Sequence, residues 1–152
     1  EDVRLVLYRL SDSVAHRLRT NRLWGRTVVL SVRDCMLHSF ERQRCIGRPT
    51  QLSGEIAQAA FGLFQKNYDW QRPIRSIGVR VTDLEEEQNV QLDFFGCERK
   101  RERMAKLEET SDEIRRRFGN GILCRASMMT APEITTMTLR QEDIARFPGA
   151  GV

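Results

Sequence analysis

In two segments near the start of the chain, apolar residues recur every three or four positions, and this spacing predicts two amphipathic helices. The first helix is expected over residues 2–20, where arginines near the end suit the negative pole of the helix dipole. The second is expected from an N-cap at Ser53 to about residue 69. The apolar positions of the two segments are Val3, Leu7, Leu10, Val14 and Leu18, then Ile56, Ala59, Ala60, Leu63 and Phe64.

Two segments after the first helix alternate between apolar and polar residues, which is typical of strands with one buried face. They cover residues 26–33 and 40–46. They are close enough in the chain to pair as an antiparallel hairpin, although no Asn-Gly turn fixes the register. Gly47 and Pro49 are expected to end the second strand.

Residues 72–84 predict a third strand, which follows the second helix. Pro73 lies near its start, where a missing N–H costs little. Because the side chains of a strand alternate between its two faces, one set would enter a core and the other would stay outside. These sets are Ile77, Val79 and Val81 for the core, and Ser76, Gly78 and Arg80 for the outside.

The order helix, strand, strand, helix, strand predicts an α+β fold, an antiparallel sheet with two helices packed on one face. It matches a βαββαβ unit without its first strand, which would precede Glu1. The chain starts at Glu1 without a methionine. We therefore interpret it as a piece of a longer protein.

The character of the sequence changes after residue 84. We expect a domain over residues 1–84, then a polar linker over 85–97 that contains the exposed apolar peptide QLDFF. Residues 98–126 predict a C-terminal extension, made of a highly charged helix to residue 118 and a short strand over 122–126. Residues 127–152 show no period and are expected to form a partly mobile tail.

Composition adds a bias toward a nucleic-acid partner. The chain has 152 residues, is 40% hydrophobic and has a net charge of +4, so it can bury a core beneath a charged surface. Only three of its 25 basic residues are lysines. Arginine binds phosphate in a bidentate manner and stacks on bases. A base-composition bias of the genome would give the same excess of arginine.

The four cysteines do not point to a metal site. None has CxxC spacing, and the two histidines follow no common ligand pattern, so we expect no zinc and reduced thiols in a cytosolic protein. His16 and His38 show no partner that would indicate catalysis. No run of about 18 apolar residues and no signal peptide is seen, which agrees with the expectation of a cytoplasmic protein.

Five segments in register resemble one protein family. The sequence up to about residue 126 is similar to the C-terminal part of bacterial Y-family translesion DNA polymerases, the DNA polymerase IV, DinB/UmuC-like (ImpB/MucB/SamB) group. The segments are SDSVAHRLR (11–19), GRTVVLSVR (25–33), PIRSIGVRVTDL (73–84), QLDFF (91–95) and DEIRRRFGNGILCRA (112–126).

The resemblance implies the little finger domain, which has the βαββαβ fold and lies against the major-groove side of primer–template duplex. In that family the catalytic palm and its Mg²⁺ ions precede this domain. The resemblance therefore implies a noncatalytic fragment, with no cofactor of its own, that acts with the rest of the polymerase chain.

DNA contacts are expected on the outer face of the sheet. Arg80 matches a phosphate-contacting position of the family, and Arg75 matches another, although strict alternation would place Arg75 beside Ile77 unless a bulge intervenes. Where the family often has a basic residue, Ser76 offers a hydroxyl and a backbone N–H, and Gly78 leaves room for the duplex. The same surface would be widened by Arg33, Arg42 and Arg44.

QLDFF resembles the pentapeptide that binds the bacterial sliding clamp, with Phe94 in place of the commoner leucine. Gln91 would form a hydrogen bond at the rim of the clamp pocket, and apolar side chains would insert as anchors. The whole peptide comprises Gln91, Leu92, Asp93, Phe94 and Phe95. Alternatively, it is simply a packed strand.

Two other functions fit parts of the sequence. An RNA-binding α+β module would need solvent-facing aromatics on its central strands, and residues 28–33 and 74–81 contain none. A protein-interaction scaffold would use QLDFF and the charged helix, whose charges otherwise form a solvated face.

The missing first strand leaves one edge of the sheet bare if, as in the family, it pairs beside residues 72–84. Exposed edges recruit partners. We expect residues 122–126, the tail or a neighbouring molecule to cover this edge, and a dimer could form through it.

Overall fold

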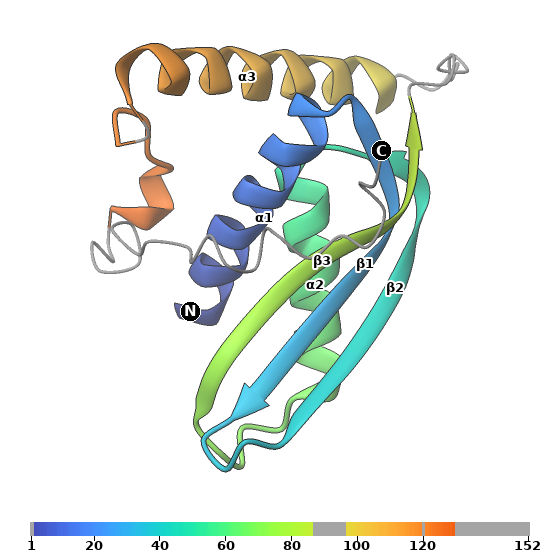
Figure 1. The fold of residues 1–152 in the computed structure, drawn as a ribbon, viewed down its shortest axis with the longest axis vertical. Coiled ribbons are helices and arrows are strands. Elements are labelled where there is room, and N and C mark those ends of the chain that lie inside the picture. The colour runs from blue at the N-terminus through green and yellow to red at the C-terminus, as the bar shows by residue number, and fades with distance from the viewer. Residues whose placement is uncertain (1, 87–96, 120, 130–152) are drawn as a thin grey trace, which may run out of the picture.

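The structure is a computed structural model that describes residues 2–86, 97–119 and 121–129. Its elements follow the expected order, with a third helix after the sheet (Figure 1). The α+β prediction with a C-terminal helical extension is therefore confirmed. The elements are α1 (Asp2–Thr20), β1 (Leu23–Asp34), β2 (Ser39–Thr50), α2 (Ser53–Asn67), β3 (Ile74–Glu86), α3 (Cys97–Phe118) and the 3₁₀ helix η1 (Ala126–Met128).

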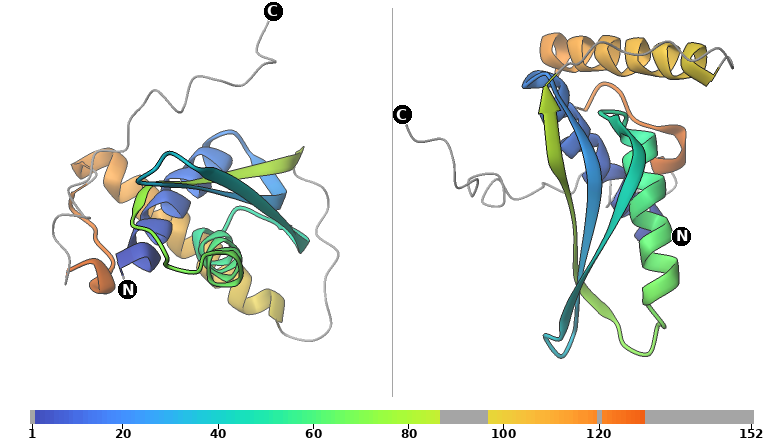
Figure 2. Two further views of the ribbon diagram at one scale, coloured as in Figure 1. Left: turned by 90° about the horizontal axis from the view of Figure 1, so that it is seen from below. Right: turned by 90° about the vertical axis from the view of Figure 1, so that its right-hand side faces the viewer.

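The described strands form one antiparallel sheet in the order β2-β1-β3, so β1 lies in the centre. Both α1 and α2 cover the same face of this sheet, as the views from below and from the side show (Figure 2). Among the described residues, no helix lies over the other face. The predicted arrangement of two helices on one face is thus confirmed.

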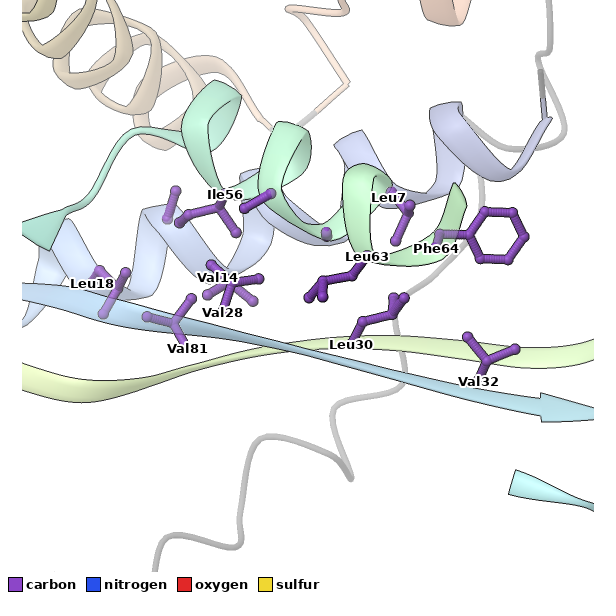
Figure 3. Packing of buried hydrophobic residues seen from close by; sticks show 13 residues of the cluster. Leu7, Val14, Leu18, Val28, Leu30, Val32, Ile56, Leu63, Phe64 and Val81 are labelled. Carbon is purple, nitrogen blue, oxygen red and sulfur yellow. The ribbon is translucent and has the colours of Figure 1, made fainter. Parts of the chain in front are cut away.

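The core lies between this sheet and the two helices (Figure 3). Val28, Leu30 and Val32 alternate along β1 and are almost completely buried. On β3, Val81 is buried, and Ile77 and Val79 are partly buried against the same cluster. The core face predicted for this strand is confirmed. The helices contribute Leu7, Val14, Ala15, Leu18, Ile56, Ala59, Ala60, Leu63 and Phe64.

Several ends differ from the sequence-based expectations. β2 does not stop at Gly47 and Pro49 but continues to Thr50. An irregular register between Gly25 and Thr27 absorbs the extra residues, and proline is tolerated because β2 is an edge strand. β3 also runs two residues beyond Leu84, so the first part of the expected linker belongs to the sheet.

The segment expected as a short strand over residues 122–126 is not one. It forms a turn and an extended loop that leads into η1, and Ile122 is exposed. In the described part of the chain, β3 pairs only with β1, so its outer edge is not covered by this segment. The prediction that residues 122–126 form a strand and cover this edge is therefore wrong. Residues 130–152, the other candidate within the chain, lie outside the described residues.

One glycine is required by close packing between β1 and β3. A Cβ on Gly25 would lie 2.0 Å from Cγ1 of the buried Val81, and no side chain can be accommodated there without movement of the core. Gly47, on the edge strand β2, has nothing within 4 Å of the equivalent position.

Gly25→Ala is therefore expected to lower the free energy of unfolding by about 1–3 kcal/mol, the usual cost of overpacking. Gly47→Ala, the matched control, should change it little. Urea denaturation of the two variants measures both values. Equal stabilities would mean that the sheet relaxes around Gly25 at no cost.

Candidate nucleic-acid interface

The face of the sheet opposite the helices is built by the residues that alternate with the core. Paired residues on neighbouring strands share a face, so the register assigns each side chain to one side. This open face comprises Thr27, Val29, Ser31 and Arg33 of β1, Ser76, Gly78, Arg80 and Thr82 of β3, and Ser39, Glu41, Gln43 and Cys45 of β2. The prediction that Ser76, Gly78 and Arg80 share a face away from the core is confirmed.

The middle of the open face is flat. Ser31 pairs with Gly78, and a Cβ on Gly78 would lie 2.6 Å from the Ser31 Oγ. The serine hydroxyl thus occupies the space that a side chain at Gly78 would need. A large partner can approach the backbone closely here, because only small groups project from this part of the sheet.

Arginines surround this flat area. Arg33, Arg75 and Arg80 are all exposed. Arg80 Nη2 lies 3.4 Å from Glu41 Oε2, but both side chains are 58% exposed, and an ion pair in such solvent contact contributes little. Within the described residues, Arg33 and Arg75 have no ion pair. Their guanidinium groups are therefore available to an anionic partner.

Arg75 reaches this surface through an irregularity in β3. Arg33 pairs with Ser76, whereas the next residue, Asp34, pairs with Ile74. Arg75 is consequently an extra, unpaired residue, which is the definition of a bulge. The structure therefore contains the bulge that the sequence analysis required for Arg75 to lie on the open face.

Arg42 and Arg44 lie on the other face, so the prediction that they widen the open face is wrong. They pair with Leu30 and Val28, which point into the core. Arg42 Nε donates a hydrogen bond to Asn67 Oδ1 of α2 at 3.3 Å, and its guanidinium lies 5.6 Å from the centre of the Phe40 ring. Phe40 packs against the core and has the same parity as both arginines, so its burial fixes their side.

The QLDFF peptide, residues 91–95, lies outside the described residues. β3 ends at Glu86 and α3 begins at Cys97, so the peptide belongs to the stretch of chain that connects these two elements.

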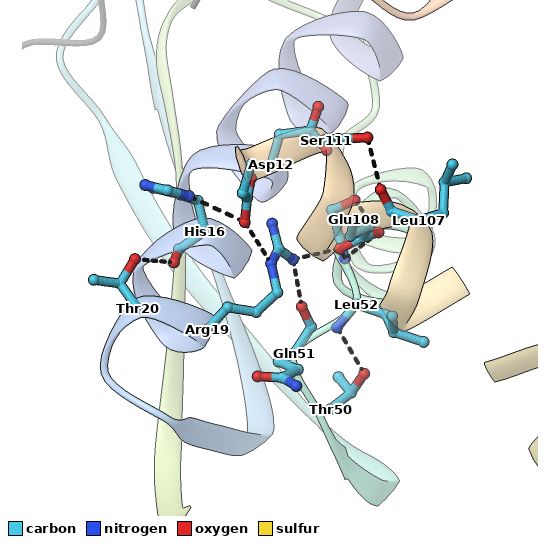
Figure 4. Close-up of polar contacts among 12 residues, drawn as sticks. Asp12, His16, Arg19, Thr20, Thr50, Gln51, Leu52, Leu107, Glu108 and Ser111 are labelled. Atoms are coloured by element: carbon cyan, nitrogen blue, oxygen red, sulfur yellow. Dashed lines mark hydrogen bonds and ion pairs between the residues drawn. The ribbon is translucent and has the colours of Figure 1, made fainter. Parts of the chain in front are cut away.

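Sequence reasoning missed a cluster of charged residues that attaches α3 to the domain (Figure 4). Glu108 of α3 is only 8% exposed. Its carboxylate accepts hydrogen bonds from the backbone N–H of Ser53 at 3.1 Å and from the Ser53 hydroxyl at 2.7 Å, and it pairs with Arg19. We refer to Arg19, Ser53, Glu108 and Asp112 as the α3 anchor.

Glu108 acts as the N-terminal cap of α2. The N-cap residue is Leu52, which has no side-chain cap, so the expectation that Ser53 caps this helix is wrong. Glu108 supplies the missing acceptor from a distant part of the chain. Its negative charge also lies at the positive end of the α2 dipole.

Arg19 of α1 contacts both carboxylates of the α3 anchor, Glu108 and Asp112. It donates from Nε to Asp112 Oδ2 at 2.7 Å and from Nη1 to the carbonyl of Gln51 at 3.0 Å. His16 Nδ1 lies 3.1 Å from the same Asp112 oxygen. Burial raises the pKa of the Asp112 carboxyl, but the hydrogen bonds from Arg19 and His16 outweigh it, so this pKa lies below its usual value.

Two further arginines attach the C-terminal segment. Arg125 donates to Asp12 Oδ1 at 2.8 Å and to the Ser53 hydroxyl at 2.7 Å. Arg101 Nε donates to Glu55 Oε1 at 2.9 Å. By contrast, the apolar side chains of Leu107 and Phe118 on α3 are 58% and 71% exposed. Charged groups, more than apolar packing, therefore hold α3 in place.

The part of the chain that the structure describes contains no group of three or more His, Cys, Asp or Glu side chains placed to hold a metal ion. Among the same residues, no helix combines the length and the apolar character that a membrane span requires.

The fold and the exposed arginines define the class of the domain: a small α+β domain with a basic, solvent-exposed sheet face. Comparison with known proteins gives the family: residues 1–94 match the impB/mucB/samB family C-terminal domain, and the chain belongs to this family. The resemblance seen in the sequence is thereby confirmed.

Named relatives agree with this assignment. The chain is 43% identical over 120 residues to a DNA polymerase IV of Acetivibrio thermocellus, covering 78% of this chain and 30% of the relative. It is 32% identical over 130 residues to a DNA polymerase IV of Moorella thermoacetica, covering 86% and 32%. A putative UV-damage repair protein, UvrX, of Bacillus subtilis is 31% identical over 133 residues, covering 86% and 31%. The chain thus spans about a third of the length of these curated relatives.

Replacing the buried carboxylate should loosen α3. Glu108→Gln removes the charge opposite Arg19 and one acceptor for Ser53, so we expect the free energy of unfolding to fall by about 1–3 kcal/mol. Glu109→Gln, at the exposed neighbouring position, is the control and should have almost no effect. Urea denaturation followed by circular dichroism measures both. Indistinguishable variants would show that the anchor contributes nothing to stability.

Proposed function

We propose that this chain is the DNA-holding domain of a Y-family translesion DNA polymerase. The open face of its sheet binds the phosphate backbone of primer–template duplex, including damaged duplex. In this proposal catalysis, with its Mg²⁺ ions, belongs to another part of the polymerase chain. The family assignment and the names of the relatives support the proposal.

The observation that carries the proposal is the pair of unpaired guanidinium groups, Arg33 and Arg75, beside the flat area formed by Ser31 and Gly78. DNA carries about one charge per 1.7 Å of its axis, and each phosphate contact releases counterions. The open face carries the exposed arginines Arg33, Arg75 and Arg80 and the acidic Glu41, so its excess of positive charge suits the phosphates of DNA.

Contacts of this kind position a duplex without reading its bases. A polymerase that copies damaged templates needs this property, because a lesion changes the base but leaves the backbone charge. In this proposal the protein acts in DNA repair, at the chromosome in the bacterial cytoplasm.

Removing the two free arginines should weaken duplex binding and its salt dependence. For Arg33→Ala with Arg75→Ala, we expect the slope of log K against log salt concentration to fall by about 2, one for each phosphate contact. Fluorescence anisotropy with a labelled blunt duplex at several salt concentrations measures the slope.

The matched control is Arg42→Ala with Arg44→Ala, which removes the same charge from the helix-covered side. This control should leave most of the slope in place. An equal loss in both double variants would refute the open face as the binding surface, and an absence of salt-dependent binding by the unaltered chain would refute the function.

We also propose that residues 91–95 tether the polymerase to the sliding clamp. The sequence offers Gln91 for the rim of an apolar pocket, and Leu92, Phe94 and Phe95 as anchors. A tether that joins the domain to the clamp raises the local concentration of the polymerase at the primer end.

Phe94→Ala with Phe95→Ala should weaken binding to a bacterial sliding clamp by about 2 kcal/mol or more, as expected for buried aromatic anchors. Surface plasmon resonance with immobilised clamp measures this loss. Phe118→Ala, which removes an exposed aromatic from α3, is the control and should bind normally. Unchanged binding by the double variant would exclude this peptide as the tether.

A further inference from the structure

Two loops form the tip of the sheet, at the end opposite α3 (Figure 1). One is the β1–β2 turn, residues 35–38, and the other connects α2 to β3, residues 68–73. We refer to these two loops together as the tip. It exposes large apolar side chains: Met36 is 65% exposed, Leu37 58% and Trp70 62%. Apolar side chains gathered in this way commonly mark a binding surface.

Two of these residues also have an unfavourable backbone. Leu37 has φ 68° and Trp70 has φ 60°, in the left-handed region that favours glycine and asparagine. Both side chains are mostly exposed, so burial in the core does not offset this strain. Strained positions of this kind concentrate at functional sites.

The tip is nevertheless held firmly. The Asp34 carboxylate accepts hydrogen bonds from the backbone N–H groups of Met36 and His38, both at 2.9 Å, and from Arg72 Nη1 at 3.1 Å. The backbone N–H of Cys35 donates to the carbonyl of Pro73 at 3.0 Å and joins the two loops. The exposed apolar side chains are thus presented on a fixed support.

Trp70 is supported by two aromatic neighbours. Its ring makes T-shaped contacts with Phe64 at 5.4 Å and with Tyr68 at 5.6 Å between ring centres. Such contacts fix the ring while most of it remains exposed. A ring held in this way can accept another planar group on its face.

The charges of the surrounding side chains indicate which kind of planar group would stack on Trp70. The side chains around the tip are more basic than acidic. The basic ones are Arg33, Arg42, Lys66, Arg72 and Arg75, and the acidic ones are Asp34, Glu41 and Asp69. The free guanidinium groups of Arg33 and Arg75 lie where the open face meets the tip, because Arg33 directly precedes the turn that Asp34 closes.

We propose that the tip binds single-stranded DNA where it leaves the duplex, with one base stacked on Trp70 and the neighbouring phosphates close to Arg33 and Arg75. This inference rests on the proposed function, since it needs a duplex on the open face. Exposed aromatic side chains combined with basic ones are the usual platform for unpaired bases, and every base has a face that can stack. Met36 and Leu37 extend the apolar part of this platform.

The test compares two DNA ligands on the whole chain: a blunt duplex, and the same duplex with a single-stranded extension of about eight nucleotides, within the usual site size. Extensions of either polarity are tried. The unaltered chain should bind one extended duplex more tightly than the blunt one. Trp70→Ala should reduce this advantage by about fivefold or more, the equivalent of one lost stacked base, while affinity for the blunt duplex remains.

Trp70→Phe, which can still stack, should retain part of the advantage, and Phe118→Ala should retain all of it. Fluorescence gives a direct readout in a Trp24→Phe background, where Trp70 is the only tryptophan. The extended duplex should quench it, and the blunt duplex should not.

The outcomes separate the two proposals. If the chain binds no duplex, the proposed function fails. If it binds blunt duplex but gains nothing from an extension, or if Trp70→Ala keeps the gain with an unchanged circular dichroism spectrum, the tip does not bind single-stranded DNA. If Trp70→Ala weakens binding to a polymerase fragment but leaves binding to the extended duplex unchanged, the tip binds a protein partner. This result would likewise overturn the inference.

Discussion

The two-faced alternation of β1 is the constraint on which the rest of the domain depends. Val28, Leu30 and Val32 enter the core, and Ser31 and Arg33 lie between or beside them on the open face. Because β1 pairs with both other strands, its register decides the face of every residue on β2 and β3. A slip of one residue would move the valines into solvent and the arginine into the core. The burial that stabilises the fold therefore also orients the basic surface.

The C-terminal helix α3 is attached to the sheet and its two helices by ion pairs and hydrogen bonds more than by apolar packing. Glu108 caps α2 and pairs with Arg19 of α1, so one carboxylate holds both core helices at the end away from the tip. A buried charge is tolerated because each of its oxygens has a partner. The chain between Glu86 and Cys97 is consequently joined at both ends to fixed elements.

The periodicity of the sequence was sufficient to predict the elements and their buried faces wherever buried residues recur at regular spacing. The helix over residues 2–20 and the core face of β3 follow from spacing alone, and the need for a bulge at Arg75 followed from its conflict with Ile77. The side of Arg42 and Arg44 could have been read from Phe40, the apolar residue of the same parity. The α3 anchor had no such signal, because a single buried carboxylate in a run of charges looks like its solvated neighbours. Only the fold brings Glu108 to Ser53, 55 residues away.

The two ends of the sheet thus differ in their contribution to the stability of the fold. At the α3 end, both oxygens of the buried Glu108 carboxylate have hydrogen-bond partners, which stabilises the attachment of α3. At the tip, Leu37 and Trp70 have a strained backbone and exposed apolar side chains, both of which reduce the stability of the fold. A residue such as asparagine at position 37 would relieve the strain without loss of core packing. Stability alone therefore does not account for leucine and tryptophan at these positions.

Stability does not account for Arg33 and Arg75 either, because their charges have no partner among the described residues. These arginines and the exposed apolar side chains of the tip lie at the same end of the open face. The simplest physical account is a ligand that satisfies both at once, and a nucleic acid does so with its phosphates and its bases.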